Sequence, residues 1–152
     1  MFSLTKLSSF SRNYPRISRQ IHIKRIDHLV LTVKNINRTI EFYEQVLSMR
    51  TETFRGGRTA LVFGDQKFNL HEVGKEFEPK ASVAAPGTVD IRLITDDRMT
   101  SVVNHLRKCD VETVYDDVVD RTGATGPIKS VYFRDPDLNL IEVSTYDVSS
   151  SV

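Results

Sequence analysis

The sequence predicts an α+β protein made of two βαβββ units that share one hydrophobic core. Residues 61–73 match residues 131–143 at a constant offset of 70 residues, with six identical positions in thirteen. Strand and helix spacings of apolar residues precede each copy in the same order. Because a chain of 152 residues has the length of one domain, the two copies must build a single core.

The first unit is predicted over residues 25–73. Residues 26–33 are apolar and rich in β-branched side chains, as in a strand that a helix covers. Apolar residues then recur at helical spacing over residues 36–47, and Asn35 or Asn37 can cap this helix. Glycine-containing breaks divide the rest into three short strands at residues 51–54, 59–63 and 67–73.

The second unit is predicted over residues 88–146, after a linker at residues 74–87. It repeats the order, with a strand, a helix that Asp96 or Asp97 can cap, and three more strands. About ten extra residues lie between Tyr115 and Lys129, and this glycine-rich insertion predicts a loop over the second unit. The expected elements are a strand at 89–95, a helix at 99–106, and strands at 111–115, 129–133 and 139–144.

Positive charge is concentrated at the N-terminus. Residues 1–25 carry six basic and no acidic residues, whereas the rest of the chain has 15 basic and 20 acidic residues. With five serines and amphipathic spacing, this stretch is typical of a mitochondrial transit peptide; the alternative is a plain basic extension ahead of the domain. We therefore expect an extension at residues 1–23, one domain at 24–147, a tail at 148–152, and a mitochondrial or cytoplasmic protein.

Composition also narrows the partners. No apolar run approaches the roughly 18 residues that a membrane span needs, and the net acidic folded part lacks the basic stripe of a nucleic-acid-binding protein. The expected partner is a small-molecule substrate, without membrane or nucleic acid. Because the edges of such sheets often pair between chains, we also expect a homodimer.

Strand alternation predicts which polar side chains come together. In residues 26–33 one face is wholly aliphatic and should pack on the helix, which leaves His28 on the other face. The same reasoning turns Asp90, Arg92 and Glu142 away from the helix of the second unit. Glu72 matches Glu142 in the repeat, so we expect four groups to converge: His28, Glu72, Asp90 and Glu142.

Three carboxylates and one imidazole on a shared surface need a compensating charge. A divalent ion would supply it, and this oxygen-rich donor set suits Mn, Fe, Ni, Co or Mg, and also Zn. Without a metal, Arg92 would pair with Asp90 or Glu142 as a structural ion pair. His71 replaces Glu72 in either scheme if a bulge at residues 64–67 reverses the alternation.

Three segments resemble the vicinal oxygen chelate superfamily: IDHLVLTV, a helix that contains FYEQVLSM, and the closing RDPDLNLIEV. The resemblance covers residues 25–146. It implies two βαβββ modules that curl into a cupped mixed sheet with the helices outside. It also implies one metal ligand from the first and last strand of each module, which here are His28, Glu72, Asp90 and Glu142. The family usually has His or Gln where this chain has Asp90.

The resemblance implies a metal-dependent lyase or isomerase that acts on a small α-oxygenated substrate chelated to the metal. Glu142 or Glu72 would double as the catalytic general base, and Arg92 or Arg121 would hold an anionic group of the substrate. The alternative is a metal-free module that sequesters a small molecule, or an inactive relative of the enzymes.

Overall fold

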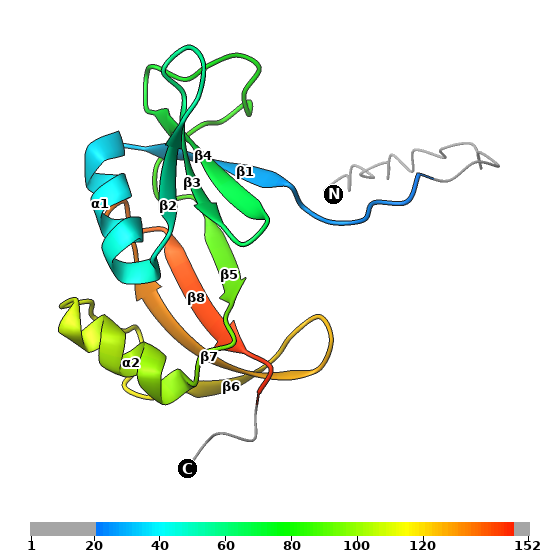
Figure 1. The fold of residues 1–152 in the computed structure, drawn as a ribbon, viewed down its shortest axis with the longest axis vertical. Coiled ribbons are helices and arrows are strands. Elements are labelled where there is room, and N and C mark those ends of the chain that lie inside the picture. Colours follow the sequence, from blue (N-terminus) through cyan, green and yellow to red (C-terminus); the bar gives the residue numbers. More distant parts are fainter. Residues whose placement is uncertain (1–20, 148–152) are drawn as a thin grey trace, which may run out of the picture.

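A computed structural model describes residues 21–147 and contains the two expected βαβββ units (Figure 1). The predicted α+β fold is therefore confirmed. The first unit contains β1 (His28–Val33), α1 (Ile36–Leu47), β2 (Arg50–Thr53), β3 (Thr59–Phe63) and β4 (Gln66–Glu72). The second contains β5 (Asp90–Ile94), α2 (Met99–Lys108), β6 (Val119–Thr122), β7 (Pro127–Arg134) and β8 (Leu140–Thr145).

Each unit forms its own four-stranded mixed sheet. The strand orders are β1-β4-β3-β2 and β5-β8-β7-β6, so the first and last strands of each unit lie side by side and parallel. The other neighbours are antiparallel hairpins. This order places residues of β1 beside β4 and residues of β5 beside β8, where the candidate site residues lie.

The two helices lie on the same side of the molecule and cover one hydrophobic core (Figure 1). Asn35 caps α1 as expected, since its side chain accepts a hydrogen bond from the Arg38 amide at 2.9 Å. Neither Asp96 nor Asp97 caps α2, which begins after Arg98 without a side-chain cap. The core joins both units, because buried residues of β1, α1 and β4 cluster with Phe133, Ile141 and others from the second sheet.

The prediction of a strand at residues 111–115 is wrong. Only Thr113 forms a bridge there, opposite Phe133. The edge strand is instead β6, which lies inside the predicted insertion and pairs with β7, with Val119 opposite Ser130 and Thr122 opposite Pro127. Proline is accepted in β7 because it stands at the first residue of the strand. The glycine-rich remainder of the insertion is the turn of this hairpin.

The two matching hairpins differ in the length of their turns. A two-residue turn, Gly64 and Asp65, joins β3 to β4, with Phe63 opposite Gln66. The corresponding residue Phe133 lies opposite Ile141, and a five-residue loop at 135–139 joins β7 to β8. The repeat matches Ile141 with position 71, so β4 is displaced by five positions relative to β8. An odd displacement puts matched residues on opposite faces of their sheets.

The five-residue loop forms a buried hydrogen-bonded junction between the units. Asp135 is 3% exposed and accepts hydrogen bonds from the Asp137 and Asn139 amides, from the Asn139 side chain and from the Tyr43 hydroxyl of α1, at 2.8–3.0 Å. Asp137 accepts from the Lys34 amide at 3.0 Å. The DPDLN part of the closing segment therefore fixes α1 and the start of that helix against the second sheet.

Parts of the sequence-based expectations lie outside the described residues. The transit peptide and the tail fall largely in residues 1–20 and 148–152. Within residues 21–147, neither helix has the length and apolar composition of a membrane span.

Candidate functional site

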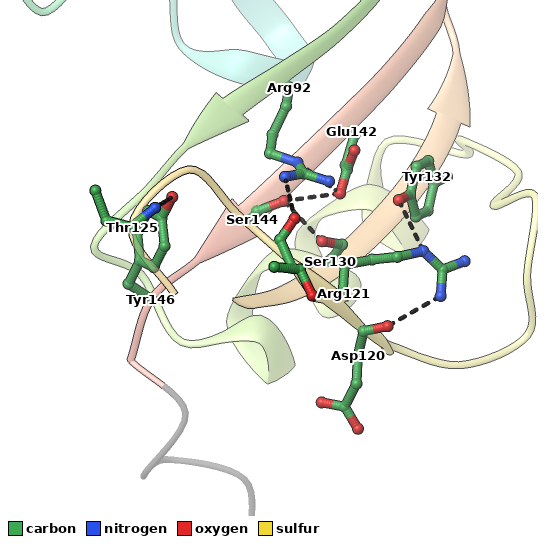
Figure 2. Close-up of polar contacts among 10 residues, drawn as sticks. Arg92, Asp120, Arg121, Thr125, Ser130, Tyr132, Glu142, Ser144 and Tyr146 are labelled. Carbon is green, nitrogen blue, oxygen red and sulfur yellow. Dashed lines mark hydrogen bonds and ion pairs between the residues drawn. The ribbon is translucent and has the colours of Figure 1, made fainter. Parts of the chain in front are cut away.

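The second sheet carries a polar cluster on its outer face, by which we mean the side turned away from α2. Arg92 of β5 lies directly opposite Glu142 of β8 in the parallel register. Arg92 Nε and Glu142 Oε1 lie 2.8 Å apart and form an ion pair. The Nε–H bond is not directed at the carboxylate oxygen, so this contact does not have hydrogen-bond geometry. The Glu142 side chain is 7% exposed and that of Arg92 is 30% exposed. The alternation predicted for this unit thus brings these two residues together (Figure 2).

Hydroxyl groups surround the Glu142 carboxylate. The Ser144 hydroxyl donates to its Oε1 at 3.3 Å, and the hydroxyls of Ser144 and Ser130 lie 2.8 Å apart. Burial raises the pKa of Glu142, but contacts with Arg92, Ser130 and Tyr132 lower that pKa by more, so the net shift is downward. Glu142 is consequently an ionised, almost fully buried carboxylate with a single cationic neighbour.

The β6–β7 hairpin is attached to this cluster at two points. The Arg92 guanidinium donates to the Thr122 carbonyl at 3.2 Å, and the Tyr146 hydroxyl accepts from the Thr125 amide at 3.3 Å. Figure 2 shows the turn of this hairpin between Tyr146 and the Arg92–Glu142 pair. Gly123 is required here, since a Cβ at this position would collide with the Tyr146 hydroxyl.

Arg121 precedes Thr122 in β6, the residue whose carbonyl Arg92 contacts. Arg121 has different partners from Arg92. Its Nε donates to the Tyr132 hydroxyl at 3.2 Å, and its guanidinium lies 5.5 Å from the centre of the Tyr132 ring. The contact with the Tyr132 hydroxyl raises the pKa of Arg121. Tyr132 pairs with Glu142 across β7 and β8, so this ring lies between Arg121 and the carboxylate.

The remaining predicted residues lie elsewhere. His28 is exposed at the start of β1, and its Nδ1 lies 2.9 Å from Asp27 Oδ2. Asp90 is exposed at the start of β5, opposite Leu140. Neither of them contacts Glu142 in the structure.

The expectation that Glu72 shares the face of His28 is wrong. Val33 lies opposite Glu72 and Thr32 lies opposite His71 in the β1–β4 pair, so His71 is on the side of His28. The cause is the short turn between β3 and β4, which displaces β4 by an odd number of positions. Glu72 instead pairs with Lys75, at the end of the strand.

His71 is the buried imidazole of the first sheet. It is 8% exposed, its Nδ1 has no hydrogen-bond partner, and its ring contacts Phe77 edge-on. Burial, followed by the charge of Arg58, lowers the pKa of His71. A buried side-chain nitrogen without a hydrogen-bond partner is rare in a folded protein.

The described residues of one chain do not assemble the predicted metal site. Among residues 21–147, no group of three or more His, Cys, Asp and Glu side chains is arranged to hold a metal ion. Glu142 is held by Arg92, His28 by Asp27 and Glu72 by Lys75. The four predicted ligands therefore do not fit a single ion within one chain.

The hydroxyl groups that surround Glu142 were not predicted from the sequence. Ser130 and Tyr132 alternate along β7, and the pattern that would have identified them is their shared parity opposite Ser144 and Glu142 in the hairpin. A cavity of about 710 Å³ lies on the helix side, between α1 and residues 109–114, and contains none of the predicted site residues.

The fold and this site define the class of protein. Residues 25–143 match the model of the Glyoxalase/Bleomycin resistance protein/Dioxygenase superfamily, and the chain belongs to that superfamily. Its paired βαβββ modules are the architecture expected from the sequence.

Individual relatives are close. The chain is 52% identical over 129 residues to "Virulence protein STM3117" of Salmonella typhimurium (85% of this chain, 89% of the relative), whose crystal structure superposes with a TM-score of 0.81. It is 47% identical over 131 residues to "Glyoxalase domain-containing protein RDO1" of Mycosarcoma maydis (86% and 73%). Integron cassette protein VCH_CASS1 from the V. cholerae mobile metagenome is 50% identical, with a TM-score of 0.83 and coverages of 85% and 100%.

Proposed function

We propose that this protein is a glyoxalase-like lyase or isomerase that binds a small α-oxygenated molecule with an anionic group on the outer face of the second sheet. The observation that carries the proposal is the Arg92–Glu142 pair, a buried ionised carboxylate in contact with one guanidinium. Buried charge pairs are costly to maintain for stability alone, and perturbed carboxylates cluster at functional sites.

Arg92 and Arg121 would bind the anionic group of the substrate. Guanidinium groups bind carboxylates and phosphates through paired hydrogen bonds. Arg92 has part of its side chain exposed, and Arg121 lies on the exposed hairpin beside it. An anion that binds Arg92 competes with Glu142 for the guanidinium.

Glu142 would act as the general base. In the ligand-free chain the contact with Arg92 helps to keep its pKa low, so the carboxylate is a weak base. When a substrate anion takes the guanidinium, burial dominates and the pKa of Glu142 rises toward the range in which carboxylates accept protons efficiently. Glu142 then takes a proton from the carbon next to the substrate carbonyl, and the C–H electrons form an enolate. In a 2-hydroxy ketone the hydroxyl proton moves to the enolate oxygen, the hydroxyl oxygen becomes the new carbonyl, and return of the first proton from Glu142 to the former carbonyl carbon completes an isomerisation.

Proton exchange with solvent tests this function directly. In D2O, a panel of 2-hydroxy ketones and 2-oxo acids should exchange the proton next to the carbonyl in the presence of the protein, as followed by proton NMR. We expect Glu142→Gln to slow exchange by about a hundredfold or more. Asp120→Asn is the matched control, because Asp120 pairs with Lys129 on the edge of the same sheet. Exchange by the Glu142→Gln variant at the wild-type rate would remove Glu142 from this role.

Metal dependence is a separate part of the proposal. Members of the superfamily are often metal-dependent. The sequence-based ligands that lie on the outer faces of the sheets are His28, Asp90 and Glu142, with His71 as the substitute for Glu72. Among residues 21–147 of one chain, these side chains do not come together as a group that could hold a metal ion. Elemental analysis after equilibration with Mn, Fe, Ni, Co, Mg or Zn and dialysis measures the stoichiometry. One ion per chain, lost in His28→Ala and Glu142→Gln, would support the ligand set; retention in both would exclude it.

A homodimer is the assembly in which we propose this site works. Apolar side chains remain exposed on the same strand faces as the candidate residues, since Val30 beside His28 is 44% exposed and Ile94 beyond Arg92 is 54% exposed. A second copy would cover such surface. Analytical ultracentrifugation of the wild type and of an Ile94→Asp variant measures this, and a wild-type monomer at micromolar concentration would exclude it.

The second candidate function is metal-free binding, in which the protein sequesters a small molecule. The observation that favours it is that Arg92 already neutralises Glu142, as in a structural ion pair. The two functions differ in one result: a sequestering protein gains thermal stability with a ligand but leaves the ligand's protons unexchanged.

Two finer statements belong to the same proposal. We propose that this protein has the same role as glyoxalase domain-containing protein 5. The resemblance lies in two segments, FGDQKFNLHEVGKEFEPKA and RTGATGP. We also propose that residues 1–23 direct the protein to mitochondria, with the cytoplasm as the alternative. Fusion of residues 1–23 to a fluorescent reporter decides between the two locations.

A further inference from the structure

The first sheet carries a basic pocket that the proposed reaction does not use. Its volume is about 250 Å³, and its walls come from the β2–β3 turn and from the outer face of β4. The turn supplies Phe54, Arg55 and Arg58, and β4 supplies Lys67, Asn69 and His71.

The turn fixes the two arginines beside the strand. The Phe54 amide donates to the Arg58 carbonyl at 2.7 Å, and the Gly57 amide donates back to the Phe54 carbonyl at 3.2 Å. Gly56 and Gly57 have φ angles of +83° and +76°, which side chains rarely adopt. This closed turn is consequently a defined structure, and Arg55 and Arg58 project from it next to Lys67.

Within residues 21–147 the three cations of the pocket have no carboxylate at salt-bridge distance, although the charge of Lys67 contributes to lowering the pKa of Asp27. Arg55, Arg58 and Lys67 form no salt bridge with any residue of 21–147, because the neighbouring carboxylates are engaged elsewhere: Glu52 with Arg50, Asp65 with Arg25, and Glu76 with Lys80. Arg58 and Lys67 lie over the rings of Phe77 and Phe54, at 4.8 and 4.2 Å. Aromatic rings attract cations but bring no formal negative charge.

His71 supplies an independent indication of a ligand. It lines the same pocket, is only 8% exposed, and has an Nδ1 without a hydrogen-bond partner. Buried side-chain nitrogens are rarely left unpaired in a native protein. An anion in the pocket would bring charge to the three cations and hydrogen-bond acceptors to the polar side chains of the wall.

We propose that this pocket binds the carboxylate or phosphate group of a small anionic ligand, with Arg58 and Lys67 as the main charged contacts and Asn69 and His71 completing the site. The pocket is too small for a macromolecular segment and matches one anionic group with a few attached atoms. The site lies on the other sheet from Glu142 and stands whether or not Glu142 is a base.

Isothermal titration calorimetry with inorganic phosphate and with acetate, at ionic strength held constant with NaCl, tests the proposal and separates the two anion classes. We expect one of them to bind the wild type, and the double variant Arg58→Gln/Lys67→Gln to bind it at least about tenfold more weakly. Arg50→Gln is the matched control, since Arg50 belongs to the same sheet but pairs with Glu52. The imidazole resonances of His71 should shift on titration in the wild type and stay fixed in the double variant.

Three results would overturn the proposal. They are the absence of binding by both anions, equal affinity of the wild type and the double variant, and an equal loss in Arg50→Gln, which would show only the general field of the surface. The double variant leaves Arg92 and Glu142 unaltered, so a loss of anion affinity together with proton exchange at the wild-type rate separates this site from the proposed reaction. Circular dichroism of each variant confirms that the fold is intact.

Discussion

The buried, charged side chain of Glu142 makes the stability of the fold depend on pH. Its folded-state pKa lies below the ordinary value of 4.5, so the folded protein holds the ionised form more strongly than the unfolded chain does. The resulting stability is fully present above pH 4.5 and is lost as the pH falls through the lower folded-state pKa. The Arg92 pair is thus a stabilising contact only while the carboxylate is charged.

We expect Glu142→Gln to lower the free energy of unfolding at pH 7 by about 1–3 kcal/mol, because it leaves the Arg92 guanidinium without its counter-charge. Since the wild type loses its advantage on acidification, the difference should shrink below about pH 4. Urea unfolding at a series of pH values measures it. Glu52→Gln is the control, as its exposed pair with Arg50 should be worth less than about 1 kcal/mol. A difference that does not change with pH would show that Arg92 does not set the pKa of Glu142.

The contact of His105 with the end of α1 could not be predicted from the sequence. His105 is exposed on α2, and its Nε2 lies 3.1–3.2 Å from the Gln45 and Val46 carbonyls at the end of α1. Free carbonyls at a helix terminus need donors, but no pattern within one helix identifies which residue of another will supply them.

The helices and the central strands were predictable because their signals are periodic. Spacing of apolar residues placed α1, α2, β1 and β5 within two residues of their observed bounds. The edge strand β6 was not, since an edge strand is short, half exposed and defined by its pairing with β7. A glycine-rich segment with polar residues on both faces is predicted as a loop unless the strand with which it pairs is known.

The loop between β7 and β8 has a structural role that was not predicted from the sequence, where it served only to identify the RDPDLNLIEV motif. Asp135 gathers four hydrogen bonds in a buried site, one of them from the Tyr43 hydroxyl of α1 at 3.0 Å. Burial, followed by the nearby charge of Asp135, raises the pKa of Tyr43 above its ordinary value, so Tyr43 remains a donor at every physiological pH. This contact joins an element of the first unit to one of the second.

We expect Tyr43→Phe to destabilise the fold by about 1–2 kcal/mol, because one donor to a buried carboxylate is lost while three remain. Chemical denaturation measures the change. Tyr115→Phe is the matched control on a ring that is 46% exposed, and it should change the free energy of unfolding by less than about 0.5 kcal/mol. Equal effects of the two substitutions would contradict a special role for the Tyr43–Asp135 contact.

At the scale of the whole molecule, the two units depend on each other. The hydrophobic core runs from Leu31 and Tyr43 in the first unit to Phe133 and Ile141 in the second, and the Phe42 and Phe133 rings lie 6.3 Å apart. Buried residues of both units belong to one cluster, as the length of the chain predicted.

We therefore expect residues 21–87, produced alone, to lack a cooperative unfolding transition, since Phe42 and Tyr43 of α1 would lose their contacts with Phe133 and Asp135 of the second unit. Full-length protein should unfold in one transition with the same midpoint by fluorescence and by circular dichroism. A fragment with dispersed NMR resonances and its own sharp transition would show that the units are separate folding domains.

The sequence sufficed for the fold and for half of the candidate site. Alternation placed Arg92 and Glu142 together because both strands of that pair are regular and central. It failed for Glu72 because sequence identity between the repeats was taken to mean identity of orientation. Pairing register depends on the number of residues in a turn, and a comparison of aligned letters does not contain that number.

The two-residue turn at Gly64 and Asp65 therefore has an evolutionary meaning. After a gene duplicates within itself, a change in the pairing register of one hairpin can turn a whole strand over, even where the two copies align without a gap, so matched side chains come to lie on opposite faces. One half of the protein can then acquire a new ligand preference while its sequence remains recognisably similar to that of the other half.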